Sequence, residues 1–160
     1  MSLPAAAMVG GAAFQYCTAL ETVNLPLAAT IEGSAFQYCD ALEAINLPAA
    51  ATIKLSAFTG CTALRSASLP TATTIGTYAF RGCTALESLT LGTALPALDT
   101  YVFRDAGRDS GGFTVYVPTA EAKDALDAAI EDTGNSWYTA LKVPANTGEG
   151  KFNGVALTQQ

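Results

Sequence analysis

Residues 35–48 read AFQYCDALEAINLP, and the pattern of this stretch recurs every 22 residues along the chain. Each copy has an Ala-Phe pair, a Cys three residues after the Phe, a Leu three residues after the Cys and a second Leu five residues later. The four copies place the aromatic and sulfur-containing residues at Phe14, Phe36, Phe58 and Phe80, and at Cys17, Cys39, Cys61 and Cys83. Such a period is the sequence signature of a solenoid, in which each copy forms one rung and buries its apolar side against the next.

Each copy contains the pattern of one strand and one tight turn. Ile45 and Leu47 alternate with Ala44 and Asn46, which is the two-residue period of a half-buried strand, and Pro48 ends it. In the Ala-Phe-x-x-Cys segment the apolar residues fall at helical spacing, which predicts one turn of α- or 3₁₀-helix. We therefore expect a parallel β-sheet on the concave face of the solenoid and short helical turns on its convex face.

The repeat also defines where the solenoid lies in the chain. Leu3-Pro4 stands 22 residues before Leu25-Pro26, so the chain is expected to open partway through a rung. The last rung is irregular, because a polar loop over residues 104–112 replaces its Cys and Leu, and a strand ending at Pro118 follows. We assign residues 1–118 to a solenoid that is truncated at its N-terminus and has an open N-terminal edge. The alternative is a natural terminus with a degenerate half-rung.

A C-terminal cap is expected over residues 119–143. Thr119 is suited to be an N-cap, and a helix to about Glu131 follows, ended near Gly134. The apolar stripe of this helix is Ala122, Leu126, Ala129 and Ile130. Such a cap is needed because an open last rung would expose its core and its strand edge.

The tail over residues 144–160 has two interpretations. Segments 140–143 and 152–157 have the character of short strands, and turn-forming residues occupy 146–150 between them. The two segments could pair as a hairpin across that turn, or the tail could be a linker to a further domain. The sequence leaves both open.

The motif A-F-x-x-C-x-x-L, followed by a short strand that ends in Leu-Pro, resembles the BspA-type leucine-rich repeats of bacterial cell-surface proteins. The resemblance covers about residues 3–118 and implies a leucine-rich-repeat solenoid. The strand, helix and aromatic pair Trp137-Tyr138 near the C-terminus are also similar to the way this family closes its solenoids. Members of the family are associated with adhesion to host proteins or other cells, and the resemblance brings no catalytic residues with it.

Composition argues against several classes of function. The net charge is −6, so phosphate backbones would be repelled and nucleic acid is not expected as a partner. There is no histidine, the commonest general base and metal ligand, so we expect no enzyme and no cofactor. No apolar run approaches the length of a membrane span. The first residues lack the basic region of a signal peptide, so a secreted protein would carry its signal outside this sequence.

Two features that suggest chemistry have simpler explanations. The cysteines lack the paired spacing of a zinc site, and their positions in a ladder give poor geometry for disulfides, so we expect reduced thiols in the core. Disulfides remain the alternative. Asp105 and Asp109 lack the spacing of a calcium loop, and Arg104 and Arg108 would compete for their carboxylates. We expect a solvated loop there and no metal site.

Candidate binding residues lie on two outer surfaces. The outward strand residues form two columns on the concave face: Thr22, Ala44, Ser66 and Ser88, then Asn24, Asn46, Ser68 and Thr90. These residues are small and uncharged, whereas binding hot spots favour Trp, Tyr and Arg, so a plain soluble sheet face is the favoured interpretation. In the turns, the pairs Gln15-Tyr16 and Gln37-Tyr38 stand where later rungs have Gly60 and Gly82, so the tyrosines are expected to form an exposed aromatic pair. Alternatively, the tyrosines cover apolar surface or pack against a preceding rung that this sequence lacks. The candidate site is therefore Tyr16, Tyr38, Gln15, Gln37, Asn24 and Asn46.

The expected function follows mainly from the resemblance. It is a non-catalytic protein-interaction or adhesion module of a bacterial cell-surface protein, extracellular or on the cell surface, with a protein partner such as a host extracellular protein. Self-association at the open N-terminal edge is a further expectation. The alternative is an architectural spacer that carries another functional domain.

Overall fold

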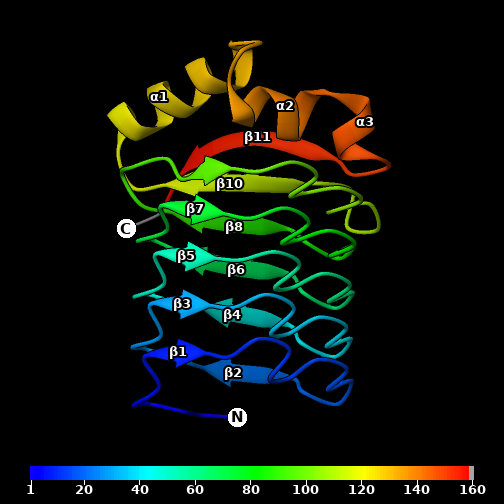
Figure 1. Cartoon of the computed structure of the whole chain (residues 1–160). Helices are drawn as coiled ribbons and strands as arrows, with labels where there is room; N and C mark the ends of the chain where they lie inside the picture. The colour runs from blue at the N-terminus through cyan, green and yellow to red at the C-terminus, as the bar shows by residue number, and fades with distance from the viewer. Residues whose placement is uncertain (159–160) are drawn as a thin grey trace.

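The computed structural model describes residues 1–158 and shows a solenoid of stacked rungs closed at one end by helices (Figure 1). The longer sheet has the strand order β11-β10-β8-β6-β4-β2, and all its pairs are parallel. Its strands are β2 (Thr22–Asn24), β4 (Ala44–Asn46), β6 (Ser66–Leu69), β8 (Ser88–Leu91), β10 (Phe113–Val117) and β11 (Phe152–Leu157). This arrangement confirms a leucine-rich-repeat solenoid with a parallel sheet along one side.

A second parallel sheet runs along another side of the coil. Its strands are β1 (Met8–Val9), β3 (Thr30–Ile31), β5 (Thr52–Ile53), β7 (Thr74–Ile75) and β9 (Ala97–Leu98). The register is 22 residues from rung to rung, as in the pair Ile31 and Ile53, until Ile75 pairs with Leu98. The single inserted residue before Leu98 therefore lies between two strands and leaves the ladder intact.

The repeated apolar residues fill the centre of the coil. Phe36, Phe58 and Phe80 are stacked with neighbouring ring centroids 5.4 Å apart, and all three are buried. On the inner side of the long sheet a second buried column consists of Val23, Ile45, Ala67, Leu89 and Val115. Each rung buries its side chains only against the rungs next to it, which is the packing mode of a repeat protein.

The Ala-Phe-x-x-Cys segments differ from the expected helical turns. Alternate N–H groups close tight turns within the segment, as when Cys39 N–H donates to Phe36 O, and the N–H groups between them donate to the next rung, as from Phe36 to Ala57 O at 2.8 Å. Ser34 and Tyr38 have φ of 58° and 59°, in the left-handed region. A continuous helix would keep all these N–H groups within the segment, whereas stacking uses half of them to join the rungs.

The C-terminal cap begins as the sequence predicts. Thr119 caps α1 (Ala120–Glu131), since its side chain accepts a hydrogen bond from Ala122 N–H. The predicted stripe of α1 is buried, and the helix ends at the C-cap Asp132, two residues before Gly134. Figure 1 shows α1 and the following helices lying across the last rungs, which confirms a helical C-terminal region.

The predicted strand over 140–143 and its hairpin are wrong. Residues 136–142 form α2 (Ser136–Lys142), followed by the short α3 (Pro144–Thr147). Trp137, Ala140 and Leu141 are the buried residues of α2, at helical spacing. β11 instead pairs in parallel with β10, so the tail adds an edge strand to the long sheet. Pairing with β10 gives β11 backbone hydrogen bonds to a strand of the long sheet. An isolated two-stranded hairpin would be only marginally stable.

All four cysteines are free, but only three are buried. Cys39, Cys61 and Cys83 lie in the core, and each Sγ lies 3.1–3.2 Å from the carbonyl oxygen of a Phe in the preceding rung, to which it donates. Cys17 is exposed, which contradicts the expectation of four core thiols. Its sequence context is that of the others, but no rung covers it on its outer side. Burial raises the pKa of Cys39 to about 11 and that of Cys61 to about 12.

Thiol labelling should therefore separate the cysteines into two classes. At pH 8 we expect iodoacetamide to alkylate Cys17 in the native protein, and Cys39, Cys61 and Cys83 only after denaturation, because burial hides their sulfur atoms and disfavours the reactive thiolate. Mass mapping of the native adduct checks this result. Equal labelling of all four residues, or a disulfide between any two, would contradict the buried ladder.

Candidate functional site

Three outer surfaces follow the length of the solenoid: the long sheet, the short sheet and the turn face. We define the turn face by the residues that lie two before, one after and two after the repeated Phe. From the first rung to the last these are Ala12, Gln15, Tyr16; Ser34, Gln37, Tyr38; Ser56, Thr59, Gly60; Tyr78, Arg81, Gly82; and Tyr101, Arg104, Asp105. Four of the six tyrosines of the chain are on this face.

The structure brings together the four turn residues of the candidate site. The rings of Tyr16 and Tyr38 are stacked, with centroids 5.2 Å apart and planes 13° from parallel, and they are 63% and 39% exposed. Beside them Gln15 Nε2 donates to Gln37 Oε1 at 2.5 Å. The Tyr38 ring also lies over Gly60, where a Cβ atom would overlap it. Tyr38 thus covers backbone on one side, and Tyr16 presents a largely open ring.

Asn24 and Asn46 lie on the long sheet and not on the turn face. They pair in register at the outer side of β2 and β4, and both are exposed. Asn24 Nδ2 also donates to Ser2 Oγ at 3.4 Å. The two predicted columns of small residues are confirmed as neighbours along this sheet. The six candidate residues therefore belong to two separate surfaces.

A second aromatic pair on the turn face was missed by sequence reasoning. Tyr78 and Tyr101 are stacked at 5.3 Å between centroids. The guanidinium carbon of Arg81 lies 5.2 Å from the Tyr78 ring centroid, and that of Arg104 lies 5.8 Å from the Tyr101 ring centroid. A signal was present, because both tyrosines stand two residues before the repeated Phe. The one-residue insertion before the last rung hid the period.

A shallow groove of about 300 Å³ lies next to Tyr38 on the turn face. We call it the glycine groove, because Gly60 and Gly82, with φ of 75° and 71°, take the place of tyrosines there. Its lining is Tyr38, Thr59, Gly60, Thr62, Arg81, Gly82, Thr84, Asp105 and Arg108. The groove is thus flanked by an aromatic ring on one side and by charged side chains on the other.

The charged loop at the last rung forms ion pairs. Arg108 Nε lies 3.0 Å from Asp109 Oδ1, and Arg108 Nη1 lies 3.3 Å from Glu149 Oε2. The hydrogen bond from Arg108 holds the pKa of Asp109 below its usual value. Among residues 1–158 no group of three or more His, Cys, Asp or Glu side chains could hold a metal ion. Arg104 and Arg108 thus lie within ion-pair distance of Asp105 and Asp109, the two carboxylates for which the sequence predicts that they compete.

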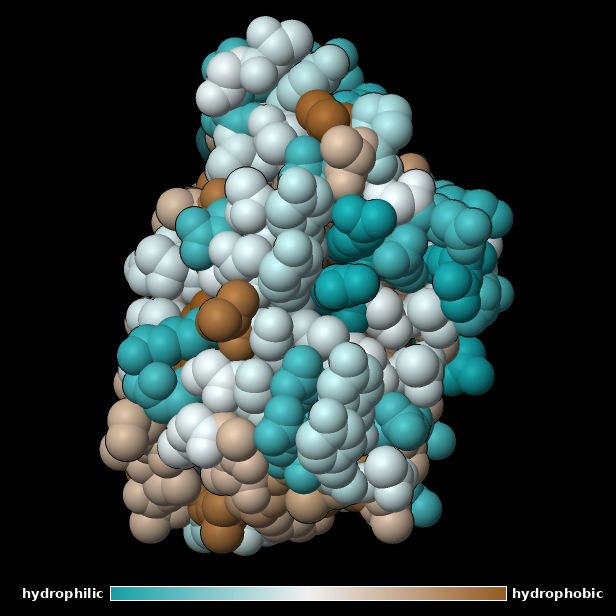
Figure 2. Space-filling model, turned by 45° about the vertical axis from the view of Figure 1, so that its right-hand side comes forward, coloured by the Kyte–Doolittle hydropathy of each residue, from teal (hydrophilic) through white to brown (hydrophobic). Residues whose placement is uncertain are grey.

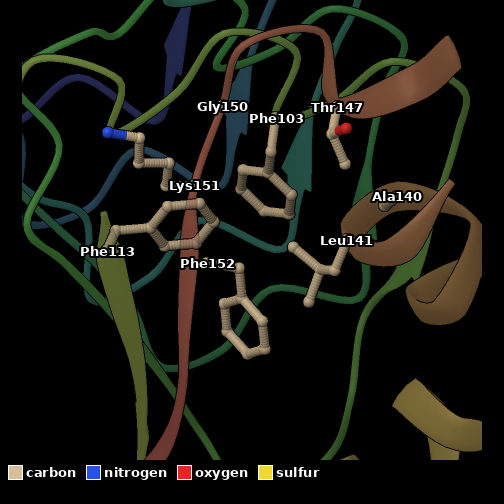
Figure 3. Close-up of a pocket in the computed structure, with 8 residues that line it drawn as sticks. All are labelled: Phe103, Phe113, Ala140, Leu141, Thr147, Gly150, Lys151 and Phe152. Atoms are coloured by element: carbon tan, nitrogen blue, oxygen red, sulfur yellow. The ribbon is translucent and has the colours of Figure 1, made fainter. Parts of the chain in front are cut away.

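The space between the cap and the last rung is too small for a ligand. Figure 3 shows Phe103, Phe113, Phe152 and Leu141 around a cavity of about 10 Å³, close to the volume that one water needs. The Phe103 and Phe113 rings are 5.2 Å apart between centroids. This region is the packed core of the cap.

The N-terminal end of the coil is the most apolar part of the surface in Figure 2, where brown and tan residues gather at the lower end. Exposed large apolar side chains of the first rungs are Met1, Leu3, Met8 and Leu27. None of the helices in the described part of the chain is long and apolar enough to span a bilayer.

Comparison with known proteins agrees with this architecture. The family model described as "BspA type Leucine rich repeat region" matches residues 3–108 in six copies. No curated protein and no solved structure matches the chain. The matched residues include every rung that carries the Phe and Cys ladders. The chain therefore belongs to the BspA-type leucine-rich-repeat family.

Proposed function

We propose that this chain is a non-catalytic protein-interaction module of a bacterial cell-surface protein, and that it binds its partner through the turn face. The observation that carries the proposal is the distribution of side chains. Tyr and Arg, which are enriched at binding hot spots, gather on the turn face, whereas the outer columns of the long sheet consist of small uncharged residues up to β8.

The stacked pairs also lower the entropic cost of binding. Tyr16 and Tyr38 support each other, and Arg81 lies over Tyr78, so these side chains are already held before a partner arrives. A surface that is ordered in the free protein loses less side-chain freedom on association. The kind of ligand we propose is a partner protein outside the cell, such as an extracellular protein of a host. The apolar N-terminal end supports self-association as a second contact.

The double variant Tyr16→Gly with Tyr38→Gly should weaken capture of the partner about tenfold or more, as loss of a hot-spot pair does. The fold should persist, because Gly60 and Gly82 occupy the equivalent left-handed positions of later rungs. Binding to an array of immobilised extracellular-matrix proteins, together with the melting temperature from circular dichroism, measures both effects. Gel filtration of the same variant tests self-association.

The matched control is Asn24→Ser with Asn46→Ser, since Ser68 occupies the same column of the long sheet. This variant should bind like wild type. If the tyrosine variant melts normally and binds unchanged while the asparagine variant loses binding, the partner site is the long sheet. If neither variant alters binding, the architectural spacer becomes the better explanation.

A further inference from the structure

We propose that the glycine groove is the recognition site for an aromatic side chain that stands next to a carboxylate in the partner polypeptide. This inference rests on the proposed function of the turn face and adds the chemistry of its ligand. It follows from three features of the groove: a gap in a ladder of rings, an arginine with no carboxylate partner, and a volume that suits a side chain.

The gap lies directly after the Tyr16–Tyr38 stack. Rings in the Phe and Tyr ladders of this protein repeat with centroids 5.2–5.9 Å apart. A third ring in the column of Tyr16 and Tyr38 would belong to residue 60 and would lie over residue 82, but both positions are glycine. A Cβ atom on Gly82 would meet only Gly60 backbone, at 3.7 Å, so the space above it is open. An incoming aromatic ring can therefore lie over the backbone of Gly82, beside Gly60 and Tyr38.

Arg81 gives the groove its charge preference. Among the described residues, Arg65, Arg104 and Arg108 each have a carboxylate within 4.0 Å, and no ion pair involves Arg81. Its guanidinium is instead positioned by the Tyr78 ring. It lines the groove beside Gly82 and keeps its donors available. A free guanidinium of this kind binds a carboxylate through charge-assisted, often bidentate hydrogen bonds.

The volume and the neighbours of the groove favour a peptide. A space of about 300 Å³ is at the lower end of the range for ligand sites and suits one or two side chains. Asp105 lies at the end of the groove away from Tyr38, and its carboxylate disfavours a second acidic group there. One ring beside one carboxylate therefore matches the groove best.

The test uses short peptides with the full chain. The probes are N-acetyl Glu-Tyr-Glu amide, N-acetyl Gln-Tyr-Gln amide and N-acetyl Glu-Ala-Glu amide, with digalacturonate as an acidic sugar. Glu-Tyr-Glu has a glutamate on each side of the ring so that one carboxylate can reach Arg81 in either direction of the peptide. Binding is followed by the amide chemical shifts of Gly60 and Gly82 in ¹H–¹⁵N spectra. We expect saturable shifts with Glu-Tyr-Glu, binding about tenfold weaker for Gln-Tyr-Gln, as for loss of one charge-assisted bond, and none for Glu-Ala-Glu.

Two variants assign the binding to the groove. Gly82→Tyr fills the groove from a left-handed position where an added Cβ atom meets only Gly60 backbone, at 3.7 Å, and should abolish peptide binding while the fold persists, because Tyr16 and Tyr38 hold equivalent positions with φ near 60°. Arg81→Gln uses the residue found at the same position in the first two rungs and should remove the preference for Glu-Tyr-Glu over Gln-Tyr-Gln. Arg65→Gln is the control, because Arg65 pairs with Glu87 and does not line the groove, and it should bind like wild type.

Several results would overturn the inference. Binding of digalacturonate alone would make the groove a carbohydrate site. Unchanged selectivity in Arg81→Gln would show that the groove does not recognise a carboxylate through Arg81, even if Gly82→Tyr failed to fold. If no peptide binds but Tyr16 and Tyr38 still control capture of a protein partner, the groove proposal fails and the proposed function stands. If the peptides bind but no protein partner depends on the turn face, the proposed function fails instead.

Discussion

Phe58→Ala is expected to lower the free energy of unfolding by about 3–5 kcal/mol, the range for truncating a large aromatic residue in a packed core. Phe58 is fully buried and lies between Phe36 and Phe80, with both ring centroids 5.4 Å away. Because each rung contacts only its neighbours, the cavity removes support from the rungs on both sides. Urea unfolding followed by circular dichroism measures the loss, which is a large share of the total stability of an ordinary domain.

Phe14→Ala is the matched control for the aromatic ladder. Phe14 has the same place in its rung, but it stacks on Phe36 only and is partly exposed. Its truncation should therefore cost clearly less than that of Phe58, about 1–2 kcal/mol, since less apolar surface is buried and solvent can fill the gap. Equal effects of the two substitutions, or a melting temperature of Phe58→Ala within a few degrees of wild type, would contradict the stacked core.

Trp137→Ala is expected to have a similarly large effect, about 3–5 kcal/mol, by loosening the cap. Trp137 is 2% exposed, its ring centroid lies 6.2 Å from that of Phe103, and its Nε1–H donates to Pro96 O at 3.1 Å. The substitution removes the ring that joins α2 to the last rung and leaves a buried carbonyl without its donor. Hydrogen exchange should show β9 and β10 losing protection before β4 and β6, because terminal rungs depend on their cap.

Trp137→Phe separates the two contributions of this residue. It keeps much of the ring packing but removes the hydrogen bond to Pro96, so a loss of about 1–2 kcal/mol is expected. Uniform loss of protection along the whole solenoid in Trp137→Ala would instead show that the chain unfolds as one cooperative unit and that the cap has no local role.

The sequence by itself determined the repeat and everything that follows from its period. A fixed spacing of Phe, Cys and Leu requires a stack of like rungs, because one rung alone cannot bury them. The inner and outer sides of each strand followed from alternation, as at Ile45 between Ala44 and Asn46. Thr119 marked the start of α1 because an N-cap is a local property of the chain.

Only the tertiary structure decided the features that depend on a neighbouring rung. The N–H of Phe36 can bond within its own turn or to Ala57 of the next rung, and stacking selects the second. Residues 136–142 have an apolar pattern too short to distinguish strand from helix, and packing on Phe103 selected the helix. Cys17 has the same local sequence as the buried cysteines, yet it is exposed because burial here is supplied by the adjacent rung and not by the residue itself.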